Sequence, residues 1–256
     1  MLLPFVYAIL QSLKPLEEIF AYPPRFFVTN PSFDNYQMLS TLTDSLWVPF
    51  SRSVLNTVFV TVVGTILTIV LSSMAAFPFA KYNFPGSKFM FQLITRALLF
   101  VGPVTQLPRY LLMAKCGMIN TYFALLGPAI AAPMGLFLLK NFMGQISTSM
   151  MEAAELDGAG MFGIWWRIVL PNVKPAILTL VILCFQSLWN LTGTSVIFDE
   201  KLKLLPTILE QVSTSGIAYS GAAAAASVIL MIPPILVFII VQSRVLETMA
   251  FAGIKE

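Results

Sequence analysis

The sequence has no histidine and few charged residues. Only 11% of its 256 residues are Asp, Glu, Lys or Arg, whereas soluble domains carry about 25%. The absence of histidine removes the commonest general base and metal ligand, and with them most hydrolase and metalloenzyme classes. No nucleophile–base pair or metal-ligating cluster is visible, so the sequence predicts neither a catalytic site nor a metal site.

Cysteine is also scarce. Cys116 and Cys184 are the only two, and they form no CxxC pattern. Because both lie in apolar surroundings, we expect two buried, inert thiols rather than a redox or zinc site. The net charge of +3 comes without any run rich in Lys and Arg, so nucleic acid is not an expected partner.

Hydrophobic residues dominate what is present. They make up 57% of the chain, and the mean hydropathy is +0.83. The sparse charges separate long uncharged runs, at residues 53–80, 116–139, 175–198 and 211–243. A helix of about 20 apolar residues spans a bilayer, so each run predicts a membrane span in a lipid bilayer.

Two further segments complete the predicted topology. The segment from about Phe89 to Leu112 contains Arg96 near its start and a Gly- and Pro-containing stretch at 102–108, which predicts a span bent against its neighbours. Residues 1–13 reach about 20 Å as a helix, less than the ~30 Å core, so we expect a truncated first span, with a signal peptide as the alternative. The sequence predicts an all-α, polytopic membrane protein of about six transmembrane helices, in one domain over residues 1–256.

The polar connection at about residues 140–174 has helix signals of its own. Ser149 followed three residues later by Glu152 fits a capping box, alanines and leucine propagate a helix, and Gly158 is a typical left-handed helix end. We therefore expect a short helix outside the membrane, from about Met150 to Asp157.

A second short piece is expected after this helix. Residues 162–170 are amphipathic, with Trp165 and Trp166 suited to the membrane interface, and Pro171 is expected to close the piece. On helix physics alone, a solvated connector and a surface for another protein fit this loop equally well.

The same loop carries a resemblance to a known family. Its fixed positions match the EAA motif of ABC-importer permeases: Glu152-Ala153-Ala154, then Gly158 after three residues, then Ile168-Val169-Leu170-Pro171 after nine more. The chain is similar in particular to the carbohydrate importers of the maltose and glycerol-3-phosphate type. The likeness extends to Ser12–Pro15, Asn35-Tyr36 and Trp189-Asn190.

The resemblance implies a cytoplasmic loop at about 140–174 that couples the permease to an ATPase. The residues it assigns to coupling are Glu152, Ala153, Ala154, Glu155, Asp157 and Gly158. It also implies a place in the bacterial cytoplasmic membrane and three kinds of protein partner: a second permease subunit, two ATPase subunits and an extracellular or periplasmic sugar-binding protein. The numbers of Lys and Arg on the two sides do not set the orientation, so the resemblance alone places this loop inside.

Nucleotide binding by this chain itself is not expected. The pattern Gly158-x-Gly160-x-x-Gly163 has the spacing of a dinucleotide fingerprint, but it follows a helix rather than a strand. No GxxxxGK[ST] phosphate-binding motif occurs either. No cofactor is therefore predicted in this chain, and ATP and magnesium are expected on the partner ATPase subunits.

The expected function is that of a permease subunit, not an enzyme, in an ATP-driven importer of a sugar or oligosaccharide. Intramembrane carboxylates, usual in proton- or sodium-driven carriers, are absent. Neutral hydrogen-bonding groups suit sugar hydroxyls, and an indole suits stacking on a pyranose. Candidate pathway residues are Asn56, Gln106, Gln186, Trp189 and Asn190, of which the last three share a helix face. Helix–helix hydrogen bonding is the alternative role for these residues. A passive channel and a non-carbohydrate ABC permease are the alternative functions.

Overall fold

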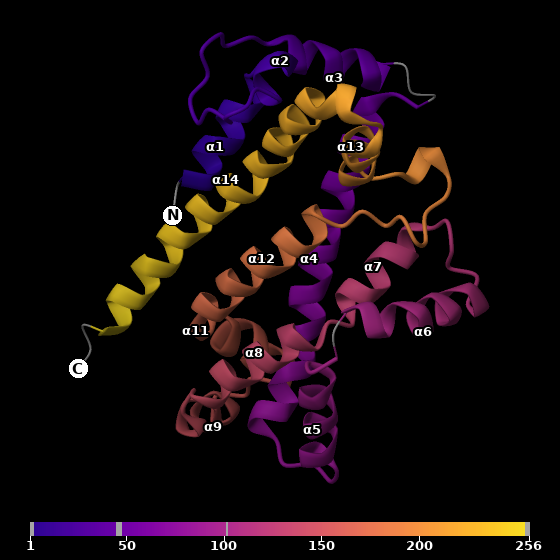
Figure 1. Ribbon diagram of the computed structural model, residues 1–256. Helices are drawn as coiled ribbons and strands as arrows, with labels where there is room; N and C mark the ends of the chain where they lie inside the picture. The colour runs from indigo at the N-terminus through magenta and orange to yellow at the C-terminus, as the bar shows by residue number, and fades with distance from the viewer. Residues whose placement is uncertain (1–2, 45–47, 101, 254–256) are drawn as a thin grey trace. The chain divides into compact units, whose positions relative to one another are not determined.

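All regular structure in the computed structural model is helical over the residues that it describes, 3–44, 48–100 and 102–253 (Figure 1). This confirms the all-α prediction. The α-helices are α1 (Leu3–Ser12), α2 (Leu16–Ile19), α3 (Asp34–Asp44), α4 (Phe50–Lys81), α5 (Ser87–Ala97), α6 (Gly102–Lys115), α7 (Tyr122–Ile130), α8 (Pro133–Gly144), α9 (Thr148–Leu156), α10 (Met161–Ile164), α11 (Leu170–Asn172), α12 (Lys174–Trp189), α13 (Leu205–Thr214) and α14 (Ser220–Gly253). A π-helix, η1 (Trp165–Val169), and two 3-10 helices, η2 (Glu200–Leu202) and η3 (Ile217–Tyr219), complete the set.

The helices are long and apolar enough for a polytopic membrane protein. Three segments have the length and composition of a membrane span: Phe50–Lys81, Tyr122–Gly144 and Ile217–Arg244. Two bent pairs, α5 with α6 and α10–α11 with α12, raise the number to five if each pair is one span. The first predicted span corresponds to α1, an apolar helix of 10 residues. Val101, inside the predicted fifth span, lies outside the described residues.

One predicted span is shorter than its uncharged run. The run at 175–198 predicts a membrane span, but only part of it is helical, because α12 ends at Trp189 after 16 residues. Beyond it, Asn190, Thr192 and Thr194 carry polar side chains that compete for backbone hydrogen bonds. Gly193 then adopts a positive φ of 66°, which a helix does not accommodate. The absence of charge therefore predicts the apolar segment correctly, but it does not predict where the helix ends.

The chain divides into two compact units, Met1–Phe59 with Trp189–Val237, and Val60–Leu188 with Phe238–Glu256. In the first unit, Asn35 ties the segment after α1 to α3. Its amide nitrogen donates to the carbonyls of Ser12 at 2.8 Å and Lys14 at 2.7 Å. A Cβ on Gly221 would lie 1.9 Å from the Asn35 amide oxygen, so only glycine lets α14 approach α3 this closely.

Backbone amides also order the loop after α2. The Glu18 carboxylate accepts hydrogen bonds from the amides of Thr29 at 2.9 Å and Asn30 at 3.5 Å. These bonds, that of Thr29 first, favour the ionised form and lower the pKa of Glu18 below its usual value.

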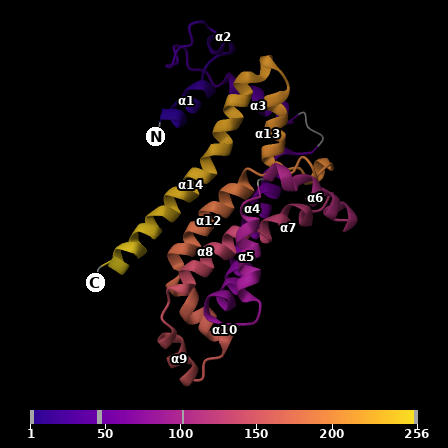
Figure 2. The ribbon, with the colours of Figure 1, turned by 60° about the horizontal axis from the view of Figure 1, so that its bottom comes forward.

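In the second unit, α4 packs closely against α8. A Cβ on Gly135 would lie 2.5 Å from the Ser72 hydroxyl oxygen. The buried Thr68 hydroxyl of α4 lies 2.7 Å from the Gly64 carbonyl and 3.2 Å from the Ala129 carbonyl. Two views agree that α9 lies at one end of this unit, whereas α6 and α7 lie towards the other (Figures 1 and 2).

Candidate functional site

The predicted helix outside the membrane spans is present as α9, Thr148–Leu156, but its beginning differs from the prediction. The residue that caps it is Ser147, and no side-chain capping hydrogen bond is formed. The predicted capping box of Ser149 with Glu152 is therefore wrong. Ser149 lies inside the helix, and its hydroxyl oxygen is 2.6 Å from that of Ser147.

The end of α9 agrees with the prediction. Gly158 adopts a φ of 83°, the left-handed conformation. Its amide donates to the Glu155 carbonyl at 3.0 Å, and the Ala159 amide donates to the Ala154 carbonyl at 2.9 Å. These two bonds form a Schellman motif, which satisfies the last carbonyls of the helix and turns the chain sharply.

The two alanines of the motif lie on different faces of α9. Met151 is 6% exposed, and the half-buried Ala154 packs against the same core. A helix outside the membrane predicts a surface position for both Ala153 and Ala154, and this prediction is wrong for Ala154. The outward face carries Glu152, Ala153, Glu155 and Asp157, together with Leu156, which is 90% exposed.

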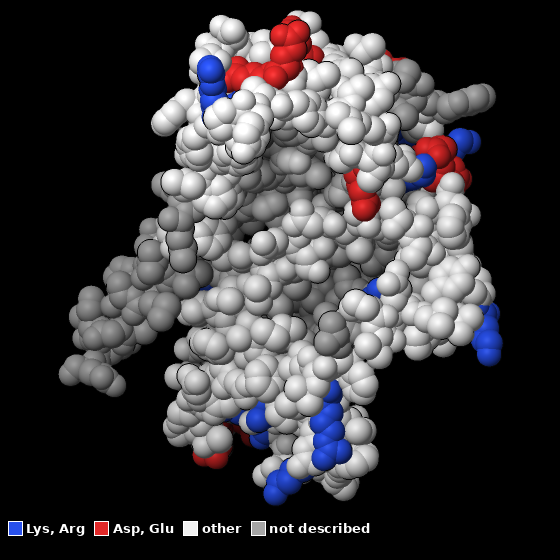
Figure 3. Space-filling view, in the orientation of Figure 1, with Lys and Arg blue, Asp and Glu red and all other residues white. Residues whose placement is uncertain are grey.

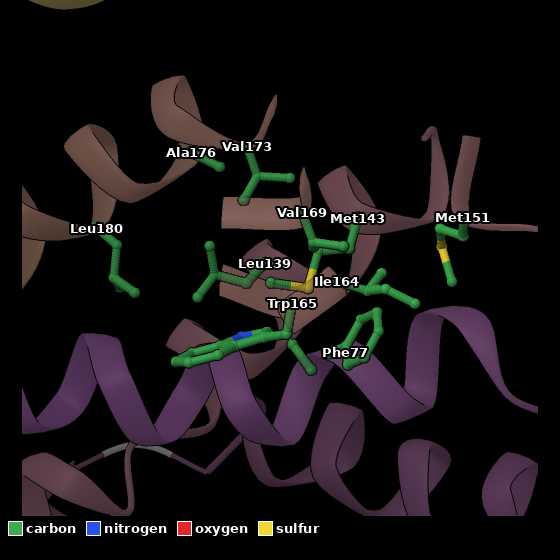
Figure 4. Packing of buried hydrophobic residues seen from close by; sticks show 11 residues of the cluster. Phe77, Leu139, Met143, Met151, Ile164, Trp165, Val169, Val173, Ala176 and Leu180 are labelled. Atoms are coloured by element: carbon green, nitrogen blue, oxygen red, sulfur yellow. The ribbon is translucent and has the colours of Figure 1, made fainter. Parts of the chain in front are cut away.

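A buried cluster joins α9 to three longer helices (Figure 4). It comprises Ala76 and Phe77 of α4, Leu139 and Met143 of α8, Met151 of α9, Ile164, Trp165, Val169 and Val173 of the following turns, and Ala176 and Leu180 of α12. Through this cluster, α9 packs together with side chains of α4, α8 and α12.

The second half of the EAA motif packs in the same buried cluster as the inward face of α9. Val169 is fully buried, and Ile168 and Leu170 pack beside it. Trp165 is 4% exposed and lies in the buried cluster, whereas Trp166 is 58% exposed. The interfacial depth of both tryptophans stays a prediction. Pro171 lies within α11 rather than after it, because a proline near a helix start loses no helical hydrogen bond.

The loop is also fixed where it begins. The Lys81 ammonium at the end of α4 donates to the carbonyl of Ile146, and it lies 3.5 Å from that of Gly144 at the end of α8. Lys and Arg side chains gather on the lower end of the molecule in Figure 3, the end where α5 and α9 lie in Figure 1. Two membrane-type helices and the extramembrane loop therefore end together at a surface that carries Lys and Arg side chains beside the carboxylates of the α9 segment.

The candidate pathway residues fall into two groups. Trp189 and Asn56 are both 5% exposed. The Trp189 indole donates to the Leu230 carbonyl at 3.0 Å, and the Asn56 amide nitrogen lies 2.9 Å from the Lys201 carbonyl and 3.2 Å from that of Lys203. The exposed members are Gln106, Gln186 and Asn190.

Cysteine placement differs from the prediction at one position. Cys184 is half-buried on α12, but Cys116, after the end of α6, is exposed. Both are free thiols.

These features define a class: a polytopic membrane protein whose extramembrane helix is fastened to the ends of its spans. The chain belongs to the family of binding-protein-dependent transport system inner membrane components, whose model matches residues 38–249. It is therefore a transport permease of the cell membrane.

Similar proteins include the arabinooligosaccharides transport system permease of Halalkalibacterium halodurans, 28% identical, with 98% of this chain and 90% of that protein covered. The polygalacturonan/rhamnogalacturonan transport system permease of Bacillus subtilis is 32% identical, with 77% and 66% covered. A solved bacterial ABC transporter involved in import of the acidic polysaccharide alginate has 25% identity and a TM-score of 0.80, with 94% and 90% covered.

Proposed function

We propose that this chain is a permease subunit of an ATP-driven importer for oligosaccharides. It works beside a second permease subunit, two ATPase subunits and an external solute-binding protein. ATP and magnesium bind on the ATPase subunits and supply the energy of transport. The observation that carries the proposal is α9, a helix outside the spans. Its outward face has a small side chain at Ala153, and its inward face is buried against the spans.

The outward face of α9 is the proposed docking surface for the ATPase. Ala153 presents only a methyl group, so another backbone can approach closely there. Leu156 offers an apolar side chain that is 90% exposed and gains from burial in a partner groove. Glu152 and Glu155 offer carboxylates for charge-assisted hydrogen bonds to basic groups on the ATPase.

The inward face is the proposed route of transmission. Met151 belongs to the buried cluster (Figure 4). The same cluster contains Phe77 of α4, Leu139 of α8 and Leu180 of α12. A displacement of α9 by ATPase closure therefore shifts α4, α8 and α12 together. The Gly158 turn keeps the helix in one orientation while this happens.

We propose oligosaccharides as the substrate class because of what the similar proteins are named for. Two permeases are named for transport of arabinooligosaccharides and of polygalacturonan or rhamnogalacturonan, and the solved transporter is named for import of alginate. The exposed Gln106, Gln186 and Asn190 provide neutral groups for sugar hydroxyls, and we assign them to the pathway. We assign a structural role to the buried Trp189 and Asn56, because their side chains already donate hydrogen bonds to backbone carbonyls.

The test is transport by the assembled importer in proteoliposomes. The purified chain alone is expected to hydrolyse no ATP, because it has no phosphate-binding motif. With its ATPase subunits, second permease and binding protein, it is expected to accumulate labelled oligosaccharide only when ATP is present. ATP hydrolysis by the homogeneous chain, or equal sugar flux without ATP as in a passive channel, would contradict the proposal.

A further inference from the structure

The placement of Arg96 in α5 is the starting point. The Phe91 ring of α5 stacks on Phe137 of α8, with centroids 6.2 Å apart, and the Lys140 ammonium lies 4.4 Å from the Phe91 centroid. Since α8 ends at Gly144, where the Lys81 ammonium also lies, α5 starts near that same membrane face. It then runs back along α8 into the membrane.

With the start of α5 taken as the membrane face, Arg96 falls at membrane depth. It is nine residues beyond Ser87, and a rise of 1.5 Å per residue puts it about 14 Å along the helix. That is close to the middle of a hydrocarbon core of ~30 Å. The sequence predicts Arg96 near the start of a bent span, whereas α5 already ends at Ala97, so Arg96 lies in its last turn. A cation is favoured there by the helix dipole.

The backbone beside Arg96 is open at the same depth. Residues 98–100 are not helical, and Leu99 and Phe100 are 80% and 65% exposed. A hollow of about 460 Å³ is lined by Leu93, Arg96, Ala97, Leu99 and Phe100. Irregular backbone at membrane depth is tolerated only where it is covered by protein or lines a water-filled cavity, and intramembrane arginines follow the same rule.

The charge around Arg96 is of one sign. Between Asp44 and Glu152 the sequence has no Asp or Glu, although it contains Arg96 and six other Lys and Arg residues. In the part of the chain that the structure describes, no carboxylate lies within ion-pair distance of Arg96. The described part of the chain therefore supplies a guanidinium at the helix break and no carboxylate within ion-pair distance of it.

We propose that Arg96 binds the negative group of an acidic sugar as it passes through the transport pathway. This rests on the proposed function. A guanidinium matches a carboxylate or a phosphate with two parallel hydrogen bonds, so the shared ligand chemistry is an oxyanion carried on a sugar. The exposed, irregular backbone beside it leaves room for the sugar ring.

The experiment compares uptake by the complete importer of three labelled probes: galacturonate trisaccharide, its methyl ester and a sugar phosphate. For wild type, we expect uptake of at least one anionic probe in preference to the ester. Arg96→Gln is expected to lower that preference about tenfold or more, the scale of a lost charge-assisted hydrogen bond. Arg96→Lys keeps the positive charge but loses the planar guanidinium that donates two parallel hydrogen bonds, so it is expected to retain part of the preference.

The matched control is Lys88→Gln, which removes a cation from the other end of α5 and is expected to keep the wild-type preference. Co-purification with the ATPase checks assembly of each variant. Uptake of galacturonate assigns the site to carboxylate, and uptake of the sugar phosphate assigns it to phosphate. The inference is overturned if wild type prefers the ester, or if Arg96→Gln leaves the preference unchanged. ATP-driven uptake of the ester alone would leave the proposed function standing, and uptake of none of the three probes would overturn the inference about Arg96. The proposed function is tested separately, by ATP-dependent uptake of a neutral oligosaccharide.

Discussion

Replacing Gly158 with valine is expected to lower ATP-driven uptake at least about tenfold while the chain still inserts into the membrane. Gly158 has a φ of 83°, and an added Cβ would meet no atom within 4 Å. The effect therefore comes from the backbone alone. The left-handed conformation costs an ordinary residue about 1–2 kcal/mol, and it is a genuine outlier for a β-branched one. The valine variant consequently loses the Schellman turn, and α9 loses its fixed orientation.

The matched control for this variant is Gly160→Val in the same loop. Gly160 has φ −71° and ψ 163°, which valine adopts readily, and its added Cβ also meets open space. The measurements are co-purification of the ATPase and substrate-stimulated ATP hydrolysis, both of which should fall for Gly158→Val only. If the two variants behaved alike, the left-handed turn would not be what positions the helix.

Replacing Ala153 with arginine is expected to abolish assembly with the ATPase without unfolding the chain. Ala153 lies on the outward face of α9, so the arginine extends into solvent in the isolated permease and into the partner in the complex. Arginine is a good helix former, so the helix itself is preserved. Ala154→Arg has a different expected effect, because Ala154 packs against the buried cluster and an arginine there forces α9 away from it.

Thermal unfolding in detergent and ATPase co-purification separate the two variants. Ala153→Arg should unfold as wild type does and bind no ATPase, whereas Ala154→Arg should unfold at lower temperature. Ala153→Ser, a small substitution on the same face, is the control and should still bind the ATPase. Full ATPase binding by Ala153→Arg would place the docking surface elsewhere.

Much of the fold could be predicted from the distribution of charge. Uncharged runs identify α4, α7–α8 and α14 because a bilayer core excludes charge over a fixed length. The position of α9 could also be predicted, because Gly158 is a strong local signal that needs no tertiary contact. The same local reasoning found the end of α9 and misplaced its start, where Ser147 competes with Ser149 for the cap.

What could not be predicted depends on tertiary packing. The break after Ala97 and the end of α12 at Trp189 both fall inside apolar segments, where hydropathy does not record a change of backbone conformation. The inward direction of Ala154 follows from the register of α9 on its core, and a helix of nine residues has too short a pattern to set that register. The bonding of Trp189 to the Leu230 carbonyl joins residues far apart in the sequence.

Cysteine cross-linking of the assembled importer tests the central claim, that the outward face of α9 contacts the ATPase. The native thiols Cys116 and Cys184 are first changed to serine, and single cysteines then replace Ala153, Leu156 or Met151. The account predicts cross-links to the ATPase subunit from the exposed positions 153 and 156, and none from position 151, which is 6% exposed in the native chain. Absence of ATPase cross-links from both exposed positions, or equal cross-linking from position 151, would contradict it.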